Sequence, residues 1–183
     1  MSKLWAYLDD EQFDGRLILA AGYLANRIAG KVVLDLNCGY ARILRYLPPT
    51  FALYVGNDLD KGALARARKQ YGGESVKFPF AFDEAMRDLP GLRVDVLLAF
   101  GYQQQYNDHD SPTLDETIYH FINRDKPKII VLEHWVDCSR KALGNLLIWC
   151  QDREYKSQQY WRVSPSFPDD RRAAREVIIL ERP

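Results

Sequence analysis

A short turn after the first buried strand is the feature that most constrains the fold. The apolar run Lys31-Val32-Val33-Leu34 is followed by Asp35-Leu36-Asn37-Cys38-Gly39-Tyr40-Ala41. The run predicts a buried strand that ends in an acidic residue, and the small residues after it predict a tight turn that opens a helix. A ligand of the nucleotide type can approach backbone N–H groups at such a turn without interference from side chains. The sequence therefore favours an α/β fold with a ligand site at this turn.

Strand-like and helix-like segments alternate along the rest of the chain. Strands are predicted over residues 31–36, 52–57, 76–80, 94–100, 128–133, 156–163 and 176–181. Helices are predicted over residues 11–29, 40–47 and 61–71, the last with Asp60 as N-cap, and after Ser111-Pro112 and Ser139. A loop without a helix joins the last two strands, which indicates an antiparallel hairpin. The pattern predicts a three-layer α/β sandwich whose sheet is mainly parallel.

Length and charge narrow the class of protein. We expect the 183 residues to form one domain, 1–183, with a sizeable core. The 25 Lys and Arg residues balance the 25 Asp and Glu residues, so the net charge is zero. Non-specific binding of nucleic acid needs a cluster of positive charges on the surface, and in this sequence the clustered basic residues are Arg171, Arg172 and Arg175. The balance therefore argues against a nucleic-acid partner.

Targeting signals and cysteine usage bear on the cellular location of the protein. The N-terminus lacks the apolar region of a signal peptide, and no run of 18 apolar residues occurs, so no membrane span is expected. Cys38, Cys138 and Cys150 form neither a metal-ligand spacing nor a disulfide framework. We therefore expect a reducing, cytoplasmic location and no metal site.

Acidic residues follow three successive predicted strands. They are Asp35, Asp58 and Asp83, and ligands of an open parallel sheet bind beyond these carboxyl ends. Asp58 could accept hydrogen bonds from ribose hydroxyls, and Asp83 from an adenine amino group while Phe82 packs on the ring. Asp35 could orient a cationic group or fix the turn through its backbone amides. An acid after a strand can also be a helix cap, which the sequence after Asp83 would suit.

The turn and these acids resemble the class I S-adenosylmethionine-dependent methyltransferases, the seven-stranded Rossmann-like family. The resemblance extends roughly from Leu17 to Arg182 and includes the terminal hairpin. It implies a sheet of strand order 3-2-1-4-5-7-6 with an antiparallel seventh strand, and S-adenosylmethionine as cofactor. It also implies a set of cofactor-binding residues: Asp35, Asn37, Cys38, Gly39, Ala41, Asp58, Leu59, Phe82, Asp83 and Phe100.

Two positions of the turn depart from the glycines typical of the family. Asn37 and Ala41 stand there, and Asn is the best non-glycine residue where φ is positive, a conformation that costs most side chains roughly 1–2 kcal/mol. We expect that the turn can still bind the cofactor, and that Gly39 is where the cofactor comes closest to the backbone. One alternative is a relative that keeps the fold as a non-catalytic binding module. Another is a nicotinamide dinucleotide site, which would place Arg42 where the fingerprint requires its third glycine.

Acceptor-binding residues are expected in the loops after the fourth and fifth strands. The candidates are Tyr102, Gln105, Tyr106 and His134. His134 can titrate near neutrality, or it can be a loop histidine held by a hydrogen bond. No general base is assigned, because methyl transfer is an in-line displacement that needs a base only when the acceptor must lose a proton early.

The motif after the fourth strand bears on the acceptor. Phe100-Gly101-Tyr102-Gln103 stands where related enzymes that methylate amino groups of bases and of glutamine carry Asn-Pro-Pro-Tyr. Together with the zero net charge, this predicts a small methyltransferase that acts on a small molecule or a protein rather than on nucleic acid.

Overall fold

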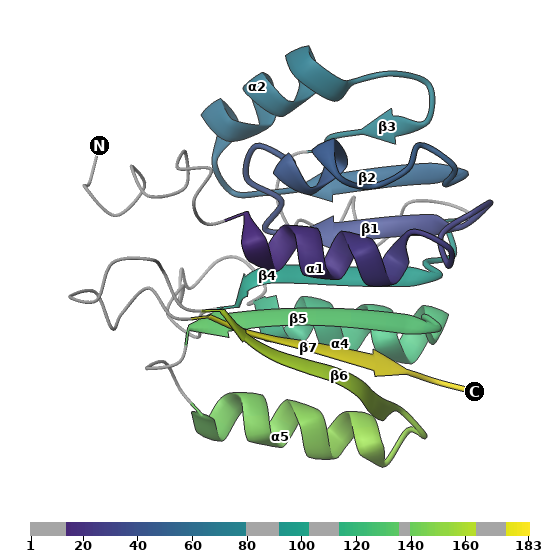
Figure 1. Cartoon of the computed structure of the whole chain (residues 1–183), viewed down its shortest axis with the longest axis vertical. Coiled ribbons are helices and arrows are strands. Elements are labelled where there is room, and N and C mark those ends of the chain that lie inside the picture. The colour runs from purple at the N-terminus through teal and green to yellow at the C-terminus, as the bar shows by residue number, and fades with distance from the viewer. Residues whose placement is uncertain (1–13, 80–91, 103–113, 136–139, 164–174) are drawn as a thin grey trace.

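Seven strands form one sheet in the parts of the chain that the structure, a computed structural model, describes: residues 14–79, 92–102, 114–135, 140–163 and 175–183 (Figure 1). The strands are β1 (Val32–Leu36), β2 (Leu53–Asn57), β3 (Val76–Lys77), β4 (Val96–Tyr102), β5 (Ile129–Trp135), β6 (Lys156–Val163) and β7 (Arg175–Glu181). The helices are α1 (Gly15–Leu24), the 3-10 helix η3 (Arg42–Arg45), α2 (Lys61–Tyr71), α4 (Leu114–Asp125) and α5 (Arg140–Gln151).

The sheet has the predicted topology. Its order is β3-β2-β1-β4-β5-β7-β6. Neighbouring strands from β3 to β5 run parallel, whereas β7 runs antiparallel to both β5 and β6. The expected strand order and the antiparallel C-terminal hairpin are therefore confirmed. The carboxyl ends of β1, β2, β4 and β5 lie at one edge of the sheet, and the start of β7 joins them there.

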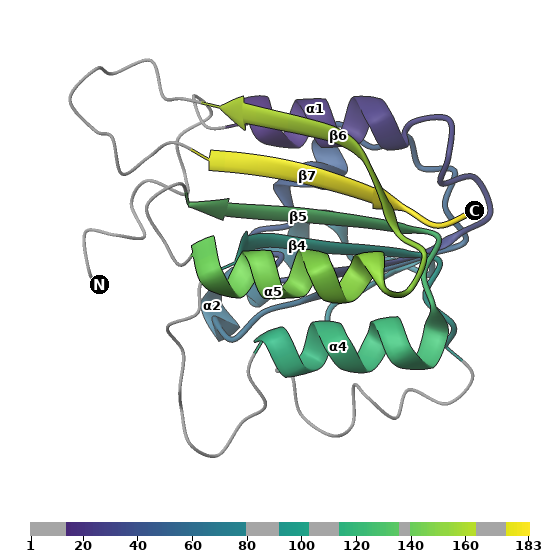
Figure 2. The same cartoon turned by 90° about the horizontal axis from the view of Figure 1, so that it is seen from below.

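Helices cover both faces of the sheet. Figure 2 shows α1 on the opposite side of the sheet from α4 and α5. Successive strand side chains point to opposite faces. Val33 belongs to the core cluster that packs under α1, η3 and α2, and its neighbour Leu34 belongs to the cluster under α4 and α5. The three-layer sandwich is thus built from two separate apolar cores.

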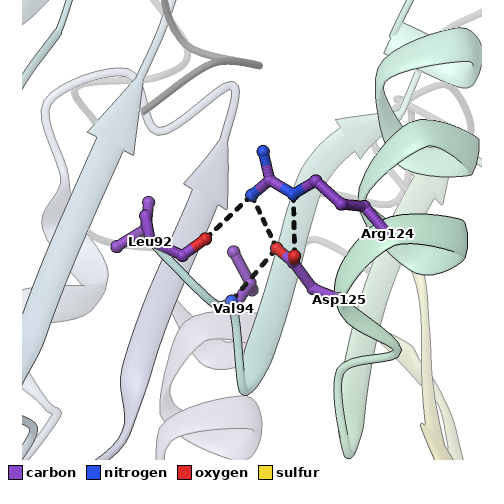
Figure 3. A network of polar contacts seen from close by, with 4 residues as sticks. All are labelled: Leu92, Val94, Arg124 and Asp125. Atoms are coloured by element: carbon purple, nitrogen blue, oxygen red, sulfur yellow. Dashed lines mark hydrogen bonds and ion pairs between the residues drawn. The ribbon is translucent and has the colours of Figure 1, made fainter. Parts of the chain in front are cut away.

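A polar network fixes the end of α4 to the start of β4 (Figure 3). Asp125 accepts the Val94 N–H at 3.1 Å, and the Arg124 guanidinium bonds both Asp125 oxygens at 2.7 Å. Arg124 also donates to the Leu92 carbonyl at 3.0 Å. This network lies at the edge of the sheet opposite the carboxyl ends of the parallel strands, so it stabilises the sheet without entering the candidate site.

The helix predicted after the turn is shorter than expected and is of the 3-10 type. A short helix is expected over residues 40–47, and the structure has one within that range: η3, a 3-10 helix of four residues. Ala41 has a left-handed φ of 53° directly before it, and the Leu44 N–H bonds the Ala41 carbonyl three residues back at 3.0 Å. The proline at position 48 then prevents the chain from continuing as a helix. The predicted short helix is therefore present, over fewer residues than expected.

Other boundaries shift by a few residues. The first helix ends at Leu24, within the wider predicted range 11–29. β3 has two residues where five were predicted, since Pro79 has no N–H to donate to a ladder. β5 continues to Trp135, so His134 lies within a strand rather than in the loop after it. The helix starts expected at Ser111-Pro112 and Ser139 lie outside the described residues.

Candidate cofactor site

The turn after β1 alternates left-handed residues with ordinary ones. Asn37, Gly39 and Ala41 have φ values of 59°, 54° and 53°. The Cys38 N–H donates to the Asn57 carbonyl at 2.9 Å, and the Ala41 N–H returns to the Cys38 carbonyl at 2.8 Å. The conformation expected at Asn37 is therefore adopted, and the backbone of the turn is tied to β2.

The turn has one tightly packed residue, Ala41, and one with open space beside it, Gly39. The Ala41 side chain is fully buried in the core under α1, which requires a small residue there. At Gly39, by contrast, an added Cβ would meet no heavy atom within 4 Å. The left-handed φ at Gly39, rather than a protein contact, is what favours glycine at this position. The backbone at Gly39 is thus open to a ligand.

Asp58 connects the end of β2 to the turn. Its Oδ2 accepts the Gly39 N–H at 2.7 Å, and its Oδ1 accepts the Asp60 N–H at 2.8 Å. Burial raises the pKa of Asp58, and these backbone hydrogen bonds oppose the rise. Each carboxylate oxygen has a second lone pair, so both can still accept from a ligand hydroxyl. Asp60 in turn caps α2 through the Gly62 N–H, as predicted.

Asp35 lies beneath the turn, in β1, with 1% of its surface exposed. The Tyr54 hydroxyl donates a short hydrogen bond to its Oδ2, whereas its Oδ1 has no hydrogen-bond partner in the described parts of the chain. Burial raises the pKa of Asp35 to about 7; the negative charge of Asp58 adds to this rise and the Tyr54 hydrogen bond opposes it. A buried polar atom without a partner is uncommon and costs free energy. Asp35 is therefore suited to receive a hydrogen-bond donor or cation from a ligand.

Solved structures of other proteins share this fold. A magnesium protoporphyrin IX methyltransferase from Synechocystis PCC 6803 with bound S-adenosylmethionine aligns with a TM-score of 0.69 at 14% identity, over 94% of this chain and 80% of that one. A proposed RNA methyltransferase from Pyrococcus horikoshii gives a TM-score of 0.65 at 14% identity, over 100% and 90% of the chains. An S-adenosylmethionine-dependent methyltransferase from Thiobacillus denitrificans with bound S-adenosylhomocysteine gives 0.60 at 13%, over 100% and 99%.

The chain has the class I methyltransferase fold. At these identities the likeness is one of fold. No protein-family model matches the sequence, and neither does any curated protein. The orphaned Asp35 oxygen, the left-handed turn and the open backbone at Gly39 fit the cofactor of this fold.

The other residues expected to bind the cofactor differ in how far they are buried. The Cys38 thiol is half-buried, and burial raises its pKa well above the usual value. Leu59 is 41% exposed beside Asp58, whereas Phe100 is buried in the core on the α1 side of the methyltransferase fold. Phe82 and Asp83 lie outside the described residues.

Two of the four acceptor candidates are described at the carboxyl ends of β4 and β5. Tyr102 pairs with His134 in the ladder between these strands. The His134 side chain is 1% exposed, and its Nε2 lies 2.8 Å from Oε2 of Glu176. His134 is thus buried within β5 against Glu176, whereas the alternative weighed from the sequence was a loop histidine held by a hydrogen bond. Gln105 and Tyr106 lie outside the described residues.

A buried ion network beside the site was missed by the sequence analysis. The Glu133 carboxylate is fully buried; it accepts the Gly101 N–H at 2.6 Å and lies 2.7 Å from Arg175 Nε and 3.5 Å from Arg16 Nε. It thereby joins the end of β4, where Gly101 has a left-handed φ of 68°, to α1 and β7. The available signal was a charged residue inside the apolar run of β5, since a buried charge needs partners.

A second ion pair ties α1 to the segment after the turn. Arg42 Nη2 lies 2.6 Å from Asp14 Oδ1, and the Tyr46 hydroxyl donates to Asp14 Oδ2 at 2.7 Å. Burial lowers the pKa of Arg42, and Asp14 opposes that change. The described residues include no group of three or more His, Cys, Asp or Glu side chains that could hold a metal ion. In the same residues, no helix is long and apolar enough to cross a membrane.

Proposed function

We propose that the chain is an S-adenosylmethionine-dependent methyltransferase. The observation that carries this proposal is the left-handed turn of Asn37, Gly39 and Ala41, with Asp35 and Asp58 at the adjoining strand ends of a methyltransferase fold. When bound, the cofactor supplies an activated methyl group on a sulfonium.

The chain's residues bind and orient that cofactor. In the proposed arrangement Asp58 accepts from the ribose hydroxyls, and Asp35 receives a cationic group. Asp83 and Phe82 contact the adenine, as the sequence resemblance implies. Tyr102, Gln105, Tyr106 and His134 border the acceptor pocket. Catalysis in this scheme comes from holding the acceptor in line with the methyl group, and no residue is assigned as a base.

For the acceptor we favour a small molecule or a protein. The zero net charge of the chain supports this choice, as does the lack of Asn-Pro-Pro-Tyr after β4. We also propose one domain over residues 1–183 and a cytoplasmic location, since the described cysteines are unpaired.

Nucleic acid is a second candidate acceptor, on one specific observation. Exposed Arg45, Arg66 and Lys69 gather on η3 and α2 next to the turn. Arg66 lies over the Tyr40 ring at 5.3 Å, and Arg45 donates to the Tyr71 hydroxyl at 3.4 Å. Basic and aromatic side chains together suit a single-stranded polyanion. Binding to a single-stranded RNA that weakens steeply with salt would favour this candidate, whereas no such binding would leave the first.

A thermal-shift measurement tests the proposal. S-adenosylhomocysteine at about 100 times its Kd should add roughly 2.7 kcal/mol to the unfolding free energy. For a chain of this length, the melting temperature should then rise by about 5–10 °C. No shift with S-adenosylmethionine or S-adenosylhomocysteine would refute the proposal, and a shift with NAD alone would support the dinucleotide alternative. Transfer of a deuterated methyl group to a component of a cell extract, read by mass spectrometry, separates an enzyme from a binding module.

A further inference from the structure

Tyr54 is a fully buried tyrosine of β2 that points its hydroxyl at Asp35. Its ring centroid lies 6.0 Å from that of Phe51 and 6.2 Å from that of Phe78, the latter pair edge-on. Full burial and these two aromatic contacts restrain the ring, so the hydroxyl has a defined position. The short hydrogen bond to Asp35 Oδ2 therefore fixes the orientation of that carboxyl group.

This orientation leaves one carboxyl oxygen available. Asp35 Oδ1 is buried and has no partner within the described part of the chain. The titratable groups that face Asp35 are the Tyr54 hydroxyl from β2, the Asp58 carboxylate after β2 and the Cys38 thiol of the turn. Among the described residues, no Lys, Arg or His forms an ion pair with Asp35. The surroundings of Asp35 thus carry negative charge and contain no described cation.

These surroundings determine where the carboxyl proton resides. Burial and the Asp58 charge raise the pKa of Asp35 to about 7, so the group is partly protonated near neutral pH. Because Oδ2 already accepts the Tyr54 hydroxyl, the proton resides on Oδ1. A cation against Oδ1 would occupy the place of that proton and would favour the ionised form.

We propose that Tyr54 is a positioning residue of the cofactor site: it orients Asp35 so that Oδ1 receives a cationic group of the cofactor, and cofactor binding releases the Asp35 proton to solvent. This proposal rests on the proposed function. The step is a simple exchange, in which the O–H bond of Asp35 breaks, the proton goes to the buffer and an ion pair forms in its place.

The test is a calorimetric titration with S-adenosylhomocysteine between pH 6 and 8.5, repeated in two buffers of different ionisation enthalpy. The affinity of the unmodified protein should fall about tenfold from pH 8 to pH 6, because binding competes with one proton whose pKa is near 7. The two buffers should show release of up to about one proton per ligand at the lower pH values.

Two variants test the roles of the pair. Tyr54→Phe removes the donor that favours ionised Asp35, so the decline in affinity should begin about one pH unit higher. Asp35→Asn should bind more weakly and with no pH dependence over this range. The matched control is Tyr155→Phe, which removes another buried hydroxyl, bonded at 2.6 Å to the Pro127 carbonyl between α4 and β5. This control should keep the pH profile of the unmodified protein.

The outcomes separate this inference from the proposed function. No binding at any pH overturns both. Flat pH profiles with both S-adenosyl ligands, or a Tyr54→Phe profile equal to that of the unmodified protein, overturn the inference and leave the methyltransferase proposal standing. If Tyr54→Phe does not fold, proton release by Asp35→Asn equal to that of the unmodified protein also overturns it. Both S-adenosyl ligands carry an ammonium group, and only S-adenosylmethionine carries a sulfonium. Proton release with both ligands would identify the ammonium as the group that faces Asp35. Proton release with S-adenosylmethionine alone would identify the sulfonium.

Discussion

Replacement of Glu133 by Gln tests the buried ion network at the carboxyl edge of the sheet. Gln keeps the size of the side chain and can still accept the Gly101 N–H, but it removes the negative charge beside Arg16 and Arg175. The side chains of both arginines are less than 10% exposed, so they cannot regain full hydration. Loss of one partner from a buried ion pair costs about 3–5 kcal/mol of unfolding free energy.

This cost can be measured by urea unfolding at pH 7, followed by circular dichroism. The melting temperature should fall in parallel by about 6–20 °C, given about 2–4 °C per kcal/mol for a chain of this length. The control is Glu181→Gln, whose pair with Arg27 has a spacing of 3.5 Å and side chains that are 30% and 45% exposed. Such a surface pair contributes at most about 1 kcal/mol. A loss below 1 kcal/mol for Glu133→Gln would show that Glu133 does not hold this edge together.

Three further substitutions follow: Gly56→Ala and Asp35→Asn test the surroundings of the turn, and Gly144→Ala in α5 is a comparison. Gly56→Ala would place a Cβ 2.7 Å from the Phe78 ring and 3.0 Å from Cys38 Sγ, so it should lower the unfolding free energy by about 1–3 kcal/mol. Gly144→Ala in α5 meets open space and should raise the unfolding free energy by up to about 1 kcal/mol. Chemical denaturation measures both changes. Asp35→Asn tests the burial of a carboxyl whose pKa is about 7 when folded and near 3.9 when unfolded. Between these values the folded state holds the extra proton, so the stability of the unmodified protein falls as pH rises from about 4 to 7. Asp35→Asn should lack this fall and be more stable above pH 7, by up to about 4 kcal/mol, and an equal decline in both proteins would contradict the assignment.

Local patterns were sufficient to predict most of the fold. The apolar runs of β1, β4 and β5 are buried on both faces, which is why they read as continuous hydrophobic segments. Asp60 was identified as the N-cap of α2 because capping depends on residues two and three positions away. The strand order followed from the family resemblance, since no local pattern in the chain specifies which strands are neighbours.

The missed features depend on tertiary contacts. Glu133 meets Arg16 and Arg175, which are distant from it in sequence, so no short motif links the three residues. Tyrosine is a common residue in strands, so Tyr54 gives no signal of its own in the sequence. Only the pairing of β1 with β2 brings its hydroxyl to Asp35. The left-handed conformation of Ala41 also has no signature in its side chain.

The turn keeps its shape without the usual glycines because its neighbours supply what the sequence lacks. A left-handed Ala costs roughly 1–2 kcal/mol, and the full burial of Ala41 under α1 helps to offset this. The charge-assisted hydrogen bond from Gly39 to Asp58 contributes about 1.5–3 kcal/mol and fixes the middle of the turn to β2. Asp58 is therefore part of the fold as well as a candidate ligand. Because the same carboxylate serves both, the turn is preorganised for a cofactor before any cofactor binds, which lowers the conformational entropy that binding must overcome.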